Sequence, residues 1–149
     1  MSNVFIVVGH SGSGKTTLVE KLLRELSGRG LRVATIKHAH HKVVLDTPGK
    51  DSFRYKQAGA VMSMLVTSNE LQLVADAVER RDPEQLAERF LGEADLVLAV
   101  KEKQEKNPEQ AVVIAADRNV RYEEVLNVMD ILQQNHVQKI GLLAKPKGQ

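Results

Sequence analysis

The 149-residue chain predicts an α/β fold in which a mostly parallel β-sheet lies between two layers of helices. Short apolar runs alternate along the chain with segments of helical periodicity, as in strand–helix–strand units. Some runs, such as residues 95–100, are apolar almost throughout, which is typical of strands buried on both faces. A glycine-rich turn also joins the first run directly to a helix. Together these observations favour a three-layer α/β sheet.

The first elements show the pattern most clearly. Five consecutive apolar residues at 4–8 predict a strand. Residues 15–28 predict a helix, because Leu18, Leu22 and Leu26 share one face. The other elements expected before residue 80 are strands at 31–36, 60–67 and 71–78 and a short helix at 52–59.

The C-terminal elements predict a second strand–helix–strand unit. A helix with proline near its start is expected at residues 83–91, followed by the buried strand. Beyond a polar, charged loop at 101–110 come strands at 111–116 and 139–144, with a helix at 122–135 between them. Because such a βαβ unit cannot bury both strands alone, we expect it to complete one continuous parallel-type sheet with the N-terminal strands.

Composition limits the function classes. Forty-two per cent hydrophobic residues and mixed charges describe an ordinary globular chain, and its length suits a single α/β domain over residues 1–149. The net charge of +2 is too small to indicate nucleic acid or an acidic membrane surface as a partner. Aromatic residues are 3% with no tryptophan, so stacking on bases is not expected. The lack of cysteine agrees with a cytoplasmic setting, and no apolar run reaches membrane length.

The turn between the first strand and helix matches G-x-x-x-x-G-K-[ST], a phosphate-binding loop. Glycines let successive backbone N–H groups point into one concavity, and the helix that follows adds the positive end of its dipole. Lys15 would contact the β- and γ-phosphates of a nucleotide, and the hydroxyl of Thr16 would bind Mg²⁺. The predicted nucleotide-binding residues are Gly9, His10, Ser11, Gly12, Ser13, Gly14, Lys15, Thr16 and Thr17.

A second polar segment follows the second expected strand, at the sheet edge where α/β proteins bind ligands. Three histidines lie there at positions 38, 40 and 41, and they indicate a metal site, contacts to a phosphorylated substrate or a solvated loop. The sequence Asp46-Thr47-Pro48-Gly49 then matches the DxxG of regulatory GTPases, which makes Asp46 a further candidate Mg²⁺ ligand. The chain nowhere contains the Asn-Lys-x-Asp with which those GTPases read guanine.

Three stretches, GHSGSGKTTL, TIKHAHH and D-x-PGKDS-x-R followed by AGA, resemble in this order the MobB family of GTP-binding adaptors in molybdopterin-guanine dinucleotide biosynthesis. The resemblance covers residue 3 to about residue 98. It implies a P-loop NTPase-like fold, GTP and Mg²⁺ as ligands, a homodimer, and the guanylyltransferase of molybdopterin as a partner. It also implies that the family's second motif, near the γ-phosphate or the partner, comprises His38, His40, His41, Lys50, Asp51 and Arg54.

The resemblance weakens at the end of the buried strand. The family has a glutamate beside Mg²⁺ where this chain has Val100, and Glu102 lies two residues further along. Residues 101–146 resemble instead the periplasmic domain of the TolR/ExbD family, which predicts an engineered hybrid with a MobB-like segment at 1–100 and a TolR/ExbD-like segment at 101–149. The alternative is a coincidental similarity of a generic βαβ unit.

Three function classes follow. The first is a MobB-like protein that binds GTP with Mg²⁺ and is at most a weak GTPase; the second is a designed scaffold with only generic phosphate binding. The third is a small-molecule P-loop kinase, although Arg80-Arg81 is the only arginine pair available for a lid. Because an acid is missing at Val100, we expect nucleotide binding with negligible turnover.

Overall fold

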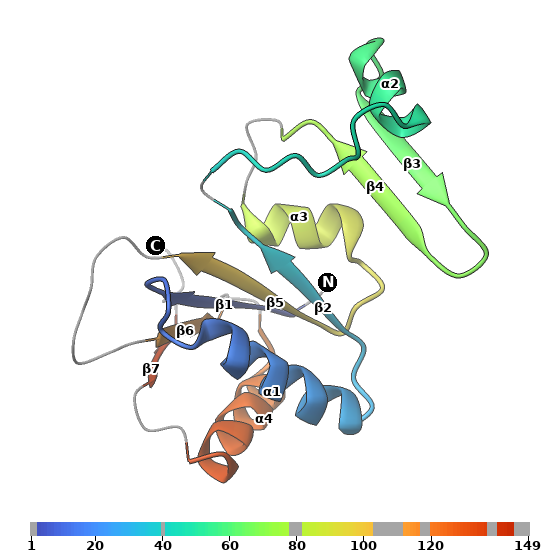
Figure 1. The fold of residues 1–149 in the computed structure, drawn as a ribbon. Coiled ribbons are helices and arrows are strands. Elements are labelled where there is room, and N and C mark those ends of the chain that lie inside the picture. The colour runs from blue at the N-terminus through green and yellow to red at the C-terminus, as the bar shows by residue number, and fades with distance from the viewer. Residues whose placement is uncertain are drawn as a thin grey trace, which may run out of the picture. The chain divides into compact units, whose positions relative to one another are not determined.

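The structure is a computed structural model that describes residues 3–39, 41–77, 82–102, 112–116, 120–136 and 140–144. The chain divides into two compact units. Unit 1 comprises Met1–His40 and Asp82–Gln149, and unit 2 comprises His41–Arg81. Figure 1 shows the elements of both units. The organisation of residues 1–149 as a single domain stays a prediction.

The described strands of unit 1 form one sheet, the main sheet, in the order β2-β5-β1-β6-β7. The bounds of these strands are β1 (Asn3–Gly9), β2 (Val33–Lys37), β5 (Leu96–Glu102), β6 (Val112–Ala116) and β7 (Ile140–Ala144). β5 lies between β2 and β1 and runs parallel to both, and β7 runs parallel to β6. The predicted α/β fold with a mostly parallel sheet and a C-terminal βαβ unit is confirmed.

Helices cover both faces of the main sheet, as Figure 1 shows. On one face, Phe5 and Leu98 pack with Leu22 of α1 (Lys15–Gly28) and with Ile131 of α4 (Tyr122–Gln134). On the other face, strand residues that alternate with these pack with Ala87 of α3 (Pro83–Phe90). The period-two alternation of β1 and β5 therefore supplies two separate apolar cores, as in a three-layer fold.

The direction of β6 differs from the expectation of a continuous parallel-type sheet. β6 runs antiparallel to β1, with Phe5 opposite Ala116 and Gly9 opposite Val112. β5 is parallel to β1, so the chain reverses direction between the end of β5 at Glu102 and the start of β6. The nine intervening residues suit a reversal, because a parallel crossover needs a dozen or more residues, usually with a helix.

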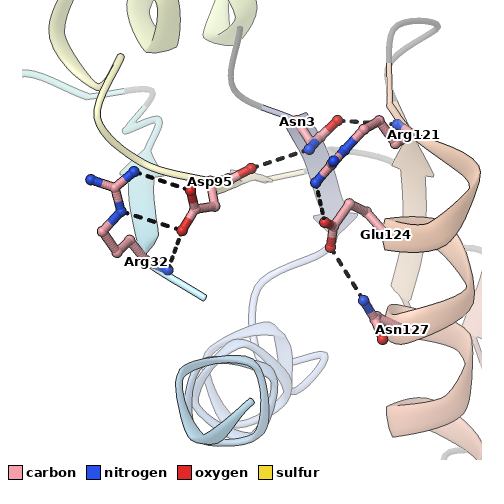
Figure 2. A network of polar contacts seen from close by, with 6 residues as sticks. All are labelled: Asn3, Arg32, Asp95, Arg121, Glu124 and Asn127. Carbon is pink, nitrogen blue, oxygen red and sulfur yellow. Dashed lines mark hydrogen bonds and ion pairs between the residues drawn. The ribbon is translucent and has the colours of Figure 1, made fainter. Parts of the chain in front are cut away.

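A polar network connects the amino ends of three elements of unit 1 (Figure 2). The side chain of Asn3, at the start of β1, donates to the carbonyl oxygen of Asp95 at 3.2 Å, just before β5. It accepts a hydrogen bond of 3.1 Å from the backbone N–H of Arg121, just before α4. The guanidinium of Arg121 binds the buried carboxylate of Glu124 at 2.9 Å, and Asn127 donates to the same carboxylate at 3.4 Å. Asn3 therefore ties β1 to the starts of β5 and α4.

The same end of the main sheet holds an ion pair between Arg32, just before β2, and Asp95 (Figure 2). The carboxylate of Asp95 accepts hydrogen bonds from the guanidinium of Arg32 and, at 2.8 Å, from its backbone N–H. These hydrogen bonds from the side chain and backbone of Arg32 lower the pKa of Asp95, and the side-chain bond raises the pKa of Arg32.

Unit 2 contains the helix α2 (Asp51–Gln57) and an antiparallel hairpin of β3 (Met62–Val66) and β4 (Leu71–Ala75). Thr67 closes the hairpin turn, because its hydroxyl accepts from the backbone N–H of Glu70 at 2.9 Å. The two hairpin strands match the strands expected at 60–67 and 71–78, within a few residues. They pair with each other in a sheet separate from the main sheet.

None of the helices in the described part of the chain combines the length and apolar character that crossing a membrane requires.

Candidate functional site: a phosphate-binding loop

The glycine-rich turn forms a curled loop between the last residue of β1 and the first of α1. Gly12 and Gly14 have φ angles of 75° and 89°, a left-handed conformation that favours glycine. The backbone N–H of Ser13 donates to the carbonyl oxygen of His10 at 3.2 Å, which closes a turn within the loop. The spacing of glycines in the sequence is therefore explained by the backbone that the loop adopts.

The start of α1 carries the features of an anion site. Gly14 is its N-cap, the helix has no side-chain cap, and its first turn contains no acidic residue. Its free N–H groups and positive dipole end are therefore not compensated by a carboxylate. The hydroxyl oxygen of Ser13 is buried and has no hydrogen-bond partner within the part of the chain that the structure describes. A buried hydroxyl without a partner is costly, so this oxygen marks a place where a ligand atom is expected.

Lys15 lies folded over the beginning of the loop. Its ammonium group donates to the carbonyl oxygens of Gly9 at 2.8 Å and His10 at 2.6 Å. Nδ1 of His10 lies 2.8 Å from the carbonyl oxygen of Ser11, so the His10 ring also contacts the loop backbone. Thr16 and Thr17 occupy the exposed first turn of α1. The predicted loop residues thus lie together in one short segment of unit 1.

The carboxyl ends of the three parallel strands meet at the same edge of the main sheet. In the pairing of β1 with β5, Val7 is level with Val100 and Gly9 is level with Glu102. The backbone N–H of His38, directly after β2, donates to the carbonyl oxygen of Val100 at 2.9 Å. This edge therefore holds the phosphate loop, Val100 and Glu102.

The second motif is divided between the two units. His38 belongs to unit 1, and His40 lies outside the described residues. The motif residues that belong to unit 2 are exposed; they are His41, Lys50, Asp51 and Arg54. Lys50 is the N-cap of α2, Asp51 lies in its first turn and Arg54 in its last. Within the described residues, no group of three or more histidine or acidic side chains could hold a metal ion.

Asp46, the further candidate for Mg²⁺, is engaged inside unit 2. One of its carboxylate oxygens, Oδ1, accepts from the backbone N–H of Thr47 at 2.8 Å and from the hydroxyl of Ser52 at 3.0 Å. Its other oxygen is buried and has no hydrogen-bond partner among the described residues. These bonds connect the segment before α2 to the helix, so Asp46 has a clear local structural role.

Sequence reasoning treated Glu102 only as a displaced acid and missed its position beside the loop. The strand register that aligns Glu102 with Gly9 depends on which strands pair, and this pairing cannot be read from either strand alone. The usable signal was the even spacing from residue 100, which keeps a side chain on the same strand face.

A family model described as "Molybdopterin guanine dinucleotide synthesis protein B", MobB, matches residues 4–133. The chain belongs to the MobB family. This match confirms the resemblance and extends it from about residue 98 to residue 133, within α4. The proposed TolR/ExbD origin of residues 101–146, and with it a hybrid chain, has no support from the comparisons.

The chain is similar to named MobB relatives over part of their length. It is 42% identical over 103 residues to the molybdopterin-guanine dinucleotide biosynthesis adapter protein of Haemophilus influenzae, covering 68% of this chain and 58% of that protein. It is 42% identical over 81 residues to the adapter protein of the same description from Escherichia coli, covering 54% and 45%. The chain thus spans about half the length of these two relatives.

The fold of the MobB family agrees with that of this chain. The crystal structure of Bacillus subtilis MobB superimposes with a TM-score of 0.52 at 27% identity, covering 97% of this chain and 80% of that one. The α/β fold with a mostly parallel sheet is therefore shared with a solved MobB structure.

Proposed function

We propose that this chain binds GTP with Mg²⁺ through the phosphate loop at residues 9–17 and acts in molybdopterin-guanine dinucleotide biosynthesis. Its relatives carry names that describe an adapter protein of that biosynthesis. In this proposal the chain is a cytoplasmic nucleotide-binding adapter, and hydrolysis is at most slow.

The observation that carries the proposal is the start of α1. An uncapped helix end, the buried unpartnered hydroxyl of Ser13 and the ammonium of Lys15 converge within a few residues. Phosphate oxygens satisfy all three, because they accept hydrogen bonds from backbone N–H groups and hydroxyls and carry negative charge toward the lysine. A glycine-rich turn without a ligand would leave the buried hydroxyl unsatisfied.

Each loop residue then has a chemical role. The backbone of residues 9–14 surrounds the phosphates, and Lys15 moves from the carbonyl oxygens of Gly9 and His10 to the β- and γ-phosphates. Thr16, exposed in the first turn of α1, offers its hydroxyl to Mg²⁺. Mg²⁺ fits this donor set, because it takes oxygen ligands and usually binds through substrate phosphates.

The test is calorimetric titration with GTP, ATP, GDP and pyrophosphate, each with and without Mg²⁺. A preference for GTP supports the MobB-like proposal, whereas equal affinity for all polyphosphates indicates a generic phosphate scaffold. ATP binding with phosphoryl transfer to a small acceptor would indicate a kinase. Thr16→Ala should weaken binding only in Mg²⁺. Lys21→Ala is the matched control, because Lys21 is an exposed lysine of α1 outside the loop.

We also propose that unit 2 is the surface through which a second copy of the chain binds. No residue in its described part is buried, and its hairpin carries large apolar side chains in the open. Val66 is 65% exposed, Leu71 61% and Met64 56%. An antiparallel hairpin of two strands is marginal alone, so a second hairpin would provide both backbone and apolar contacts. The guanylyltransferase of molybdopterin is the alternative occupant.

The second motif is proposed to serve binding of the guanylyltransferase of molybdopterin rather than binding of the second copy. His41, Lys50, Asp51 and Arg54 are exposed in unit 2, where charged side chains could contact a phosphorylated ligand or the partner. Substituting Lys50 and Arg54 by alanine should leave the affinity of the isolated chain for GTP unchanged and weaken binding of the partner enzyme. Reduced GTP affinity in this variant would place the motif at the nucleotide instead.

A further inference from the structure

We propose that Glu102 is the positioning residue for the Mg²⁺ of the phosphate loop and acts through the waters of that ion, in place of the acid that the family resemblance implies at position 100. This inference rests on the proposed binding of nucleotide at the loop. Three observations support this role for Glu102: the register of its strand, the face of the sheet on which it lies, and its charge.

The register of β1 and β5 places Glu102 beside the beginning of the loop. Gly9, the first loop residue, is level with Glu102, and neighbouring strands lie about 4.8 Å apart. Val100 is level with Val7, which is two residues, or about 7 Å, before the loop starts. In this chain Glu102 therefore lies opposite the first residue of the loop, whereas Val100 does not.

The alternation of β5 places Glu102 on the face that α1 covers. Leu98 packs in the same core as Leu22 of α1, and Val100 packs against that core. Ala99, by contrast, packs with Ala87 of α3 on the opposite face. Because every second residue of a strand points to the same side, Glu102 follows Leu98 and Val100 onto the face of α1. The first turn of α1 also carries Thr16, the proposed Mg²⁺ ligand.

The charge of Glu102 fits a metal rather than the phosphates themselves. A carboxylate level with Gly9 repels phosphate oxygens unless a cation lies between them. Mg²⁺ that binds through substrate phosphates keeps several of its waters, and the carboxylate of Glu102 would orient those waters. Glu102 is also exposed at the end of its strand, so its substitution removes no core packing.

The inference predicts that Glu102→Gln changes the affinity for GTP differently with and without Mg²⁺, which gives a specific test. The affinity for GTP is measured by calorimetry, with Mg²⁺ and with a chelator, for the wild-type chain and for Glu102→Gln. With Mg²⁺ we expect the substitution to weaken GTP binding about 10- to 100-fold, the usual range for outer-sphere partners of a metal. Without Mg²⁺ it should leave the affinity unchanged or increase it, because a negative charge next to the phosphates is gone. Glu102→Asp, which keeps the carboxylate, should retain part of the Mg²⁺ dependence.

Two controls separate this inference from the proposed function. Glu88→Gln removes the same charge from an exposed position on α3, and it should leave both affinities unchanged. Lys15→Ala should reduce affinity in both conditions. Equal changes with and without Mg²⁺ in Glu102→Gln, or no change in either, would overturn the role of Glu102. No effect of Lys15→Ala would instead overturn the loop as the nucleotide site.

Discussion

The ammonium group of Lys15 lies 2.8 Å from the carbonyl oxygen of Gly9, so the lysine of the phosphate loop is hydrogen-bonded to the loop's own first residue. Gly9 also ends β1 and is level with Glu102 of β5. One glycine thus lies next to both charged groups that we assign to the nucleotide and its metal. We therefore expect GTP binding to depend on Lys15 with or without Mg²⁺, and on Glu102 only when Mg²⁺ is present.

Lys15→Ala should weaken GTP binding by about 2 kcal/mol, in the range measured for hydrogen bonds to charged groups. The loss follows because the lysine exchanges its carbonyl partners for phosphate oxygens, a charge-assisted contact that alanine cannot make. Calorimetric titration measures this change, with Lys21→Ala as the control in the same helix. An unchanged affinity in Lys15→Ala would show that the nucleotide binds elsewhere.

Ile131→Ala in α4 should destabilise unit 1 by about 2–5 kcal/mol, the range for removing a large buried aliphatic side chain. Ile131 is 1% exposed and belongs to the core that α1 and the main sheet share. Leu126→Ala is the matched control, because Leu126 lies on the same helix and is 46% exposed. Urea unfolding followed by circular dichroism measures both. Loss of only the α4 signal, with the remaining sheet intact, would contradict one cooperative unit.

Acid should weaken the fold partly through Asp95. The hydrogen bonds from Arg32 lower the pKa of Asp95 in the folded state, so its carboxylate stabilises the fold above its unfolded pKa of about 4. This contribution disappears as the pH falls through the lower folded value. Asp95→Asn should therefore show a smaller loss of stability below about pH 4 than the wild-type chain, measured by urea unfolding across pH. Parallel pH profiles for the two proteins would exclude this contribution.

Charge placed on the hairpin should prevent self-association. Met64→Glu combined with Val66→Glu puts two carboxylates on exposed apolar positions of β3, where they would repel the same residues of a second copy. Analytical ultracentrifugation should give a dimer for the wild-type chain and a monomer for this variant. Leu126→Glu, an exposed apolar position on α4, should remain dimeric. A monomeric wild-type chain would contradict the proposed assembly.

Steady-state turnover of GTP should be negligible. Holding Mg²⁺ is not sufficient for hydrolysis, because a water must also be aligned with the leaving oxygen. Losing several kcal/mol of transition-state stabilisation lowers a rate by several powers of ten. A phosphate-release assay measures the rate, and Lys15→Ala distinguishes its source. A rate typical of P-loop GTPases that Lys15→Ala abolishes would show that this chain does assemble a catalytic site.

Local patterns predicted most of the fold. The leucines of α1 at helical spacing and the apolar runs of β1 and β5 specify their elements without reference to the rest of the chain. The prediction that β6 continues a parallel-type sheet was wrong, because β6 runs antiparallel to β1. Its direction depends on how the chain turns between residues 102 and 112, which no local pattern specifies. The network around Asn3 was not predicted either, since Asn3 and its partner Arg121 are 118 residues apart in sequence. Likewise, the motif alone located the loop in the sequence. The position of Glu102 opposite Gly9 became known only from the pairing of β1 with β5.

Unit 2 occupies a continuous stretch of sequence between β2 and α3, while both cores of unit 1 are built from residues outside that stretch. Insertions, deletions or recombination within residues 41–81 therefore leave every strand of the main sheet and every residue of the phosphate loop in place. Given the proposed roles of unit 2 and of the loop, natural variation within this segment alters what the protein assembles with and leaves nucleotide binding unchanged. Such a chain can acquire a new partner by exchanging one contiguous segment of its gene.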